Sequence, residues 1–295
     1  MLTRQHIDDF ISQHQLPAKF NYLIEEYYYP LAAWLKQQRR VKKTLFLGIS
    51  GAQGTGKTTL ADFLQLVLAE DEGWRVAVLS IDDFYLTRAE RRKLSETVHP
   101  LLITRGVPGT HDLKLLSTCI EQLRNLDSKN TLSLPRFDKA QDDRASIETW
   151  PVVAGPVDLI ILEGWCIGSA PQTLDALSQP INKLERDMDP TGDWCNFVNR
   201  QLEDEYADLF AELDYIFFLQ APNFEAVFRW RLEQEEKLAA NSTDDSVGIM
   251  DRSQIEGFMQ HYERLTRANI LTLPKIADIV LELDDNHDCV RSFIG

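Results

Sequence analysis

The segment GISGAQGTGKTTL (48–60), which follows directly on the apolar run that starts at Thr44, limits the possible folds more than any other feature. It matches G-x-x-x-x-G-K-[S/T], the Walker A pattern, at every fixed position from Gly51 to Thr58. Glycines let the backbone turn its N–H groups inward around phosphate oxygens, and the positive end of the following helix points at the anion. The pattern therefore predicts a strand, a phosphate-binding loop and a helix.

Each side chain type in this loop has a chemical use. A lysine at position 57 reaches the outer phosphates of a nucleotide and takes a catalytic role, and a threonine at position 58 offers a hydroxyl ligand to Mg²⁺. ATP and Mg²⁺ are the expected cofactors. The predicted nucleotide-binding residues are Gly51, Ala52, Gln53, Gly54, Thr55, Gly56, Lys57, Thr58 and Thr59.

Most of the predicted strands are continuous apolar runs without alternation, which is typical of parallel strands that are covered on both faces. Helical segments separate them, so crossover units and a doubly wound sheet are expected. The predicted fold is an α/β, three-layer P-loop NTPase sandwich with helices on both faces and lid and substrate insertions. Its five parallel strands are expected at 44–50, 75–81, 157–164, 214–220 and 277–285.

Outside these strands, the sequence divides into an N-terminal helical extension (1–42) and a P-loop kinase domain (43–295). Two amphipathic helices are expected in the extension, near 3–14 and 19–39. The segment 165–213 is longer than a simple crossover needs and is interpreted as an insertion. The segment 238–248, LAANSTDDSVG, is predicted to be a polar loop between two helices.

Composition restricts the class of partner and the compartment. The 295 residues carry a formal net charge of −15, which argues against nucleic acid and anionic membrane as partners, because neutralising phosphate needs surplus Lys and Arg. The four cysteines form no C-x-x-C pair, so neither a zinc site nor a disulfide is expected. No stretch is long enough to span a bilayer, and the expected location is cytoplasmic.

Acidic residues follow two of the predicted strands. In a doubly wound sheet, ligands bind at the carboxyl ends of the strands. Glu163 ends the apolar run VDLIILEG and is the expected Mg²⁺ partner of Thr58. Asp82 and Asp83 follow the second strand, and we predict that Asp82 is the base that accepts the proton of a substrate hydroxyl.

The sequence lacks the motifs that a switch GTPase needs to sense the nucleotide and to recognise guanine. Such a protein needs D-x-x-G after the third strand, whereas this chain continues L-E-G-W, and its Asn182-Lys183-Leu184-Glu185 lacks the Asp of N-K-x-D. A small-molecule kinase is the favoured class. A regulatory P-loop NTPase, whose ATP turnover drives a partner, is the alternative, and monomer or dimer stays open.

Basic residues gather between positions 99 and 144, in turn-rich stretches rather than on one helix face. Arginine presents a fork that suits a carboxylate or a phosphate. An anionic or polyhydroxylated acceptor is therefore expected here. The group consists of His99 and the predicted substrate-binding residues Arg105, His111, Arg136, Lys139 and Arg144.

The helix predicted after Pro222 carries two arginines. Arg231 shares the inward face of Phe224 and Val227, so we predict that it is a catalytic lid arginine, with either phosphate or a neighbouring carboxylate as its anion. Arg229 points roughly the other way and is assigned to the nucleotide side.

Taken together, GAQGTGKTTL, VLSIDDFYLT and ILEGW resemble the P-loop kinases that include uridine kinase, phosphoribulokinase and pantothenate kinase. The finer resemblance, over about residues 43–285, is to the D-glycerate 3-kinase type, through RGVPGTHD, LPRFDKA, FRWRLEQE and MDRSQIEGFMQHYERLT. In that group S-x-D-x-F-Y carries the catalytic Asp, which supports Asp82 over Asp83. Asp83 and Tyr85 of the same motif are assigned to the substrate.

What the resemblance implies is transfer of the ATP γ-phosphoryl to D-glycerate. One departure concerns the segment after PRFDK, where the family pattern has glycines before Asp-Arg and this chain reads AQDDR (140–144). Acceptors of another kind therefore stay open, namely a nucleoside, pantothenate or a sugar acid.

Overall fold

The structure is a computed structural model that describes residues 2–39, 43–241 and 250–294. Its central sheet has six strands in the order β10-β9-β8-β1-β7-β2. Five of them are parallel, which confirms the predicted fold class. Their bounds are Leu45–Gly51 (β1), Val76–Ser80 (β2), Leu159–Gly164 (β7), Tyr215–Gln220 (β8) and Ile279–Leu283 (β9). β1 and β7 lie in the middle and are buried along their whole length.

The sixth strand, β10 (Cys289–Ile294), was not predicted. It pairs antiparallel with β9 at the edge of the sheet, with a register shift between Cys289 and Arg291. Val290 and Phe293 are exposed. Its sequence, CVRSFI, is neither a continuous apolar run nor a regular alternation of apolar and polar residues, so it carries little strand signal.

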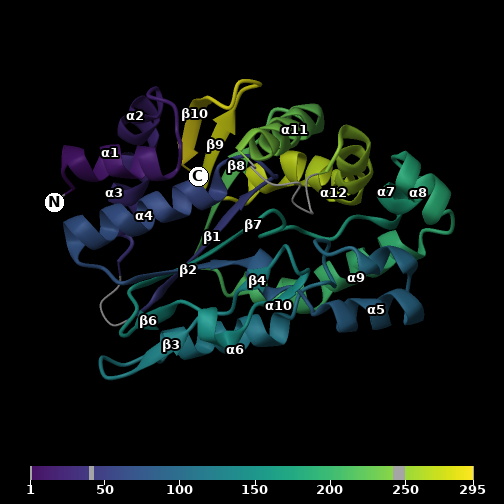
Figure 1. The fold of residues 1–295 in the computed structure, drawn as a ribbon, viewed down its shortest axis with the longest axis horizontal. Coiled ribbons are helices and arrows are strands. Elements are labelled where there is room, and N and C mark those ends of the chain that lie inside the picture. Colours follow the sequence, from purple (N-terminus) through teal and green to yellow (C-terminus); the bar gives the residue numbers. More distant parts are fainter. Residues whose placement is uncertain (1, 40–42, 242–249, 295) are drawn as a thin grey trace.

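Helices cover both faces of the sheet (Figure 1). Leu45, Leu47 and Ile49 of β1 join one apolar cluster, while Phe46 joins the other, as expected for side chains that alternate across a strand. The first cluster includes α4 (Lys57–Glu72), α11 (Phe224–Asn241) and α12 (Arg252–Thr272). The second includes α6 (Leu113–Arg124) and α10 (Glu205–Ala211).

The N-terminal helices pack against the helix that follows the phosphate loop. α1 (Arg4–Gln13) is followed by α2 (Phe20–Leu23), a π-helical turn (Ile24–Tyr28) and α3 (Tyr29–Gln37), in place of the single second helix that was predicted. Phe63 of α4 contacts Phe10 and Tyr28, at ring-centroid distances of 5.5 and 5.6 Å. The extension therefore shares one hydrophobic core with the helix that begins at Lys57.

The insertion after β7 is helical. It contains α7 (Leu174–Leu177), α8 (Lys183–Met188) and α9 (Asp193–Glu203), followed by α10. A buried ion pair ties it to α12, since Arg264 lies 2.6 Å from Glu185. Residues 238–241 of the predicted polar loop continue α11 as helix, and 242–248 lie outside the described residues.

The chain between β2 and β7 forms mostly short elements. A two-stranded hairpin, β4 (Phe137–Asp138) and β5 (Asp143–Arg144), follows a helical turn (Ile81–Phe84) and α5 (Arg88–Thr97) along the chain. A second small sheet pairs β3 (Thr131–Ser133) with β6 (Val152–Ala154), and 3-10 turns lie at 100–103, 147–149 and 273–275.

Among the described residues, no helix is both long and apolar enough to cross a membrane.

Candidate active site

The phosphate loop connects β1 to α4 as the sequence predicts. Gly56 directly precedes the helix with φ 90°, a left-handed conformation that glycine adopts without steric cost. The Lys57 ammonium donates a hydrogen bond to the carbonyl oxygen of Ala52 at 3.0 Å. Thr55 donates to the same oxygen at 2.9 Å, so the loop closes on itself around Ala52.

Lys57 lies close to two carboxylates, Glu163 and Asp82. Burial lowers the pKa of Lys57, while the negative charges of Glu163 and Asp82 oppose this effect. The loop lysine, the end of β7 and the residue after β2 are therefore electrostatically coupled. This is the grouping that the strand-end argument predicts.

Glu163 and Thr58 face each other at the end of β7. The Thr58 hydroxyl lies 3.4 Å from Oε1 of Glu163, and Glu163 is only 5% exposed. Burial raises the pKa of Glu163, and the neighbouring Asp82 adds to the rise, whereas Lys57 opposes it. A hydroxyl and a carboxylate at this spacing are oxygen ligands of the kind that Mg²⁺ takes beside nucleotide phosphates.

The Asp82 carboxylate has both oxygens engaged. The Tyr85 hydroxyl donates to Oδ1 at 2.7 Å, and the Lys139 ammonium donates to Oδ2 at 2.9 Å. Burial acts to raise the pKa of Asp82, but the charge and hydrogen bond of Lys139 and the hydrogen bond of Tyr85 outweigh it. The pKa of Asp82 is lowered as a result.

Asp83 points to a different group of residues. Its carboxylate accepts a hydrogen bond from the backbone N–H of Phe137 at 3.2 Å and pairs with Arg136 at 3.2 Å. Burial raises the pKa of Asp83, with Arg136 acting against the rise. Asp83 therefore anchors the β4–β5 hairpin, and of the two residues it is Asp82 that contacts the hairpin lysine, Lys139.

His111 stacks on Tyr85 beside this carboxylate. Their ring centroids lie 4.9 Å apart at an interplanar angle of 27°, and the two residues form an isolated antiparallel bridge. Nδ1 of His111 lies 2.6 Å from the hydroxyl of Tyr206, while Nε2 is buried and finds no hydrogen-bond partner among the described residues. Burial lowers the pKa of His111 to about 4.

The other predicted substrate-binding cations are paired with carboxylates of the protein. Arg144 lies 2.9 Å from Asp112, and Arg105 pairs with Asp142. Arg136 and Lys139 pair with Asp83 and Asp82, as described above. His99 is directed elsewhere, because its Nδ1 accepts from the N–H of Leu101 and its Nε2 lies 3.7 Å from Asp189.

Of the two anions left open for Arg231, the structure shows the carboxylate. Arg231 is 15% exposed and pairs with the buried Glu235 one turn along α11. Arg229 is about half exposed and pairs with Asp285, which follows β9. Trp230, which lies between them, packs against the phosphate loop, since a Cβ on Gly54 would lie 3.1 Å from Cβ of Trp230.

Sequence reasoning missed Arg91, the largest fully buried side chain of the described chain. Its guanidinium donates to the carbonyl oxygens of Leu86, Ile103 and Asp142 at 3.1, 2.7 and 2.8 Å. It therefore joins three loops that surround the candidate substrate residues. The charged segment RAERRKLSET gave no signal that one of its arginines turns inward.

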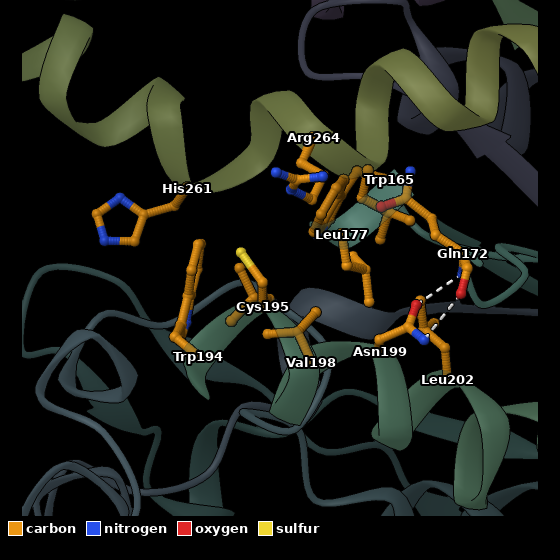
Figure 2. Close-up of a pocket in the computed structure, with 12 residues that line it drawn as sticks. Trp165, Gln172, Leu177, Trp194, Cys195, Val198, Asn199, Leu202, His261 and Arg264 are labelled. Carbon is orange, nitrogen blue, oxygen red and sulfur yellow. Dashed lines mark hydrogen bonds between the residues drawn. The ribbon is translucent and has the colours of Figure 1, made fainter. Parts of the chain in front are cut away.

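A separate hollow lies between the insertion and α12 (Figure 2). It has a volume of about 30 Å³, and mostly apolar side chains of α9 and α12 line it, together with Trp165. Asn199 exchanges two hydrogen bonds with the backbone of Gln172 at its rim. The hollow contains none of the phosphate-loop residues and is too small for a nucleotide, so we do not assign the chemistry to it.

Comparisons with known proteins decide the family. No family model matches the chain. An uncharacterized kinase of Schizosaccharomyces pombe is 34% identical over 77% of this chain and 81% of its own length. The chain belongs to the same kinase family, and its Walker A loop makes it a P-loop kinase.

Two further relatives support this placement within the P-loop kinases. The chloroplastic D-glycerate 3-kinase of Arabidopsis thaliana is 32% identical over 84% of this chain, and the match spans 54% of the length of that enzyme. The solved structure of a D-glycerate 3-kinase from Cryptococcus neoformans matches 95% of this chain and 100% of that one, with 26% identity and a TM-score of 0.74. This chain is therefore an ATP-dependent phosphotransferase.

Proposed function

We propose that this kinase transfers the γ-phosphoryl group of Mg-ATP to a hydroxyl of D-glycerate. The observation that carries the proposal is the position of Asp82, which is coupled to the phosphate-loop lysine on one side and paired with the cation Lys139 on the other. Relatives named as D-glycerate 3-kinases support the choice of acceptor.

Thr58 and Glu163 are the proposed Mg²⁺ ligands, since their oxygens lie 3.4 Å apart at the mouth of the phosphate loop. When bound, the ion neutralises negative charge that builds up on the phosphates. The backbone of residues 51–59 holds those phosphates in place, and Lys57 stabilises the charge on the transferred group.

In the transfer step, the acceptor oxygen bonds to the γ-phosphorus as the bond from that phosphorus to the β–γ bridging oxygen breaks, and ADP leaves. The proton of the acceptor hydroxyl passes to the Asp82 carboxylate. Tyr85 holds one oxygen of that carboxylate through its hydroxyl and so fixes the orientation of the base.

The acceptor carboxylate is proposed to bind the substrate cluster, defined as the cations Arg105, Arg136, Lys139 and Arg144 together with the neutral His111. Because each arginine and the lysine are paired with a protein carboxylate, a substrate carboxylate binds by replacing or joining one of these partners. Lys139 is the most exposed of them, at 60%, and its pair therefore costs least to rearrange. Asp83 acts through the hairpin that carries Arg136 and Lys139.

The two arginines of α11 are proposed to act at the nucleotide. Arg231 acts on the transferred phosphoryl only after it exchanges Glu235 for that anion, and Arg229 lies near the turn that follows β9.

The role of residues 1–42 as a separate extension and the cytoplasmic location stay predictions.

The test is ADP formation from Mg-ATP, with D-glycerate compared against nucleosides, pantothenate and other sugar acids. A large stimulation by D-glycerate alone is the expected result. Stimulation by a different acceptor would keep the kinase and replace its substrate. Slow turnover that no acceptor accelerates would favour a regulatory NTPase instead.

A further inference from the structure

We propose that Tyr206 is a positioning residue that holds His111 in one tautomer, with its proton on Nε2, so that Nε2–H donates a hydrogen bond to an oxygen of the acceptor. This inference rests on the proposed function for the identity of the acceptor. The tautomer itself follows from the hydrogen bonds around Tyr206.

A phenol has one proton to donate, and its oxygen also accepts. The backbone N–H of Gly109 donates to the Tyr206 oxygen at 3.0 Å, and the backbone N–H of His111 also acts on this oxygen as a donor. Nδ1 of His111 lies 2.6 Å from the same oxygen. Tyr206 is fully buried, and the described residues offer its proton no further acceptor. The Tyr206 proton therefore goes to Nδ1, which makes Nδ1 an acceptor.

His111 is neutral in this arrangement. Burial lowers the pKa of His111 to about 4, although the charge of Asp82 acts in the opposite direction. Burial also raises the pKa of Tyr206, so the phenol keeps the proton that it donates. A neutral imidazole whose Nδ1 accepts carries its single proton on Nε2.

The His111 ring lies next to the tyrosine that orients the proposed base. The His111 ring stacks on Tyr85, whose hydroxyl donates to Asp82. Because Nδ1 faces Tyr206, Nε2 is on the other side of the imidazole ring, where it is buried and has no partner within the described chain. A buried donor without an acceptor is costly, and an oxygen of a hydroxy acid bound next to Asp82 removes that cost.

The loop that carries His111 is held in place by Tyr262 of α12 and by Trp165. Gly106 has φ 127°, and a Cβ there would lie 2.0 Å from the Tyr262 hydroxyl. Trp165, two residues beyond Glu163, donates to the Gly106 carbonyl oxygen at 2.8 Å. The position of the His111 ring is therefore fixed from both the backbone and the Tyr206 side.

Nitrogen-15 NMR of the histidine-labelled full chain tests the tautomer directly. The chain has six histidines, so the His111 signals are identified by their loss in His111→Gln. We expect Nδ1 unprotonated and Nε2 protonated in the wild type, and a mixture of both tautomers in Tyr206→Phe. A proton on Nδ1 in the wild type would overturn the proposal, whatever the enzyme phosphorylates.

Steady-state kinetics test the donor. His111→Gln places an amide N–H near the position of Nε2, whereas His111→Asn places it near that of Nδ1. We expect His111→Asn and Tyr206→Phe to raise the KM for the acceptor by about 10- to 100-fold, the value of a hydrogen bond to a charged group, with little change in the KM for ATP. His111→Gln is expected to retain a larger share of the wild-type affinity.

Tyr215→Phe is the matched control, because it removes a tyrosine hydroxyl that bonds to Gln38 at 3.1 Å, away from His111. Equal acceptor KM values in the wild type, His111→Asn and Tyr206→Phe would show that Nε2–H binds no substrate oxygen. If D-glycerate proves inactive while the NMR shows the expected tautomer, the proposed acceptor fails and the Tyr206–His111 assignment stands. The KM comparison is then made with the acceptor that the panel identifies.

Discussion

Lys139 and Asp82 are 57 residues apart in the chain, yet the lysine ammonium lies 2.9 Å from Oδ2 of the aspartate. The partner of the proposed base is thus carried by the turn of the β4–β5 hairpin, which Asp83 anchors through the N–H of Phe137. The hairpin that carries the proposed acceptor-binding residue Lys139 therefore also lowers the pKa of the proposed base.

Replacing this lysine is expected to shift the pH dependence of the reaction. Burial raises the pKa of Asp82, and the charge and hydrogen bond of Lys139 reverse that effect, so Lys139→Met raises the pKa above its present lowered value. Because the base acts when ionised, the acid limb of the kcat profile moves to higher pH. Lys139→Arg, which keeps the charge, is the control. An unchanged acid limb in Lys139→Met would show that Asp82 is not the group that titrates.

The two adjacent aspartates are expected to have separable effects. Asp82→Asn removes the proton acceptor and lowers kcat by about 100- to 10,000-fold, the usual contribution of a positioned base, while ATP binding is retained. Asp83→Asn weakens the anchor of Arg136 and raises the acceptor KM with a smaller loss of kcat. ADP formation and equilibrium binding of ATP distinguish the two. Comparable losses of kcat in both variants would contradict the assignment of Asp82, and not Asp83, as the base.

Much of the fold follows from the sequence, because the parallel strands are buried on both faces and read as apolar runs. The phosphate loop, Asp82 and Glu163 were placed from their positions at strand ends, where topology brings them together. The pairings of the cations were not predictable, since Lys139 and Asp82 meet only through the tertiary position of a hairpin. Tyr206 was missed for the same reason, as it lies 95 residues from His111.

The buried arginine of α5 is expected to dominate the stability of the substrate-side loops. Arg91→Met leaves three carbonyl oxygens without their donor and Asp142 without one of its cations. A loss of about 2 to 5 kcal/mol in the free energy of unfolding is expected, measured by urea denaturation. Arg92→Met, at an exposed position of the same helix, is expected to change that free energy by less than about 0.5 kcal/mol. Equal losses of unfolding free energy in Arg91→Met and Arg92→Met would rule out the structural role assigned to Arg91.

Asp142, in the turn of the β4–β5 hairpin, has an unfavourable backbone conformation and forms two ion pairs. Its φ is 55°, in the left-handed region, and its carboxylate pairs with both Arg91 and Arg105. The family resemblance leads us to expect glycine here, and glycine takes this conformation without steric cost. The carboxylate of Asp142 thus supplies a contact for two arginines that a glycine cannot make.

Two substitutions separate these contributions. Asp142→Gly and Asp142→Ala both remove the carboxylate, but only alanine has to hold a left-handed φ with a Cβ, at a cost of about 1 to 2 kcal/mol. Asp142→Ala is therefore expected to be less stable than Asp142→Gly by about 1 kcal/mol, after allowing for the greater entropy of unfolded glycine, as measured by urea unfolding. Both are expected to change the acceptor KM alike, because both release Arg105 from its carboxylate partner. If Asp142→Gly is no more stable than Asp142→Ala, the backbone relaxes at this turn. If the acceptor KM is unchanged in both variants, Arg105 does not bind the acceptor.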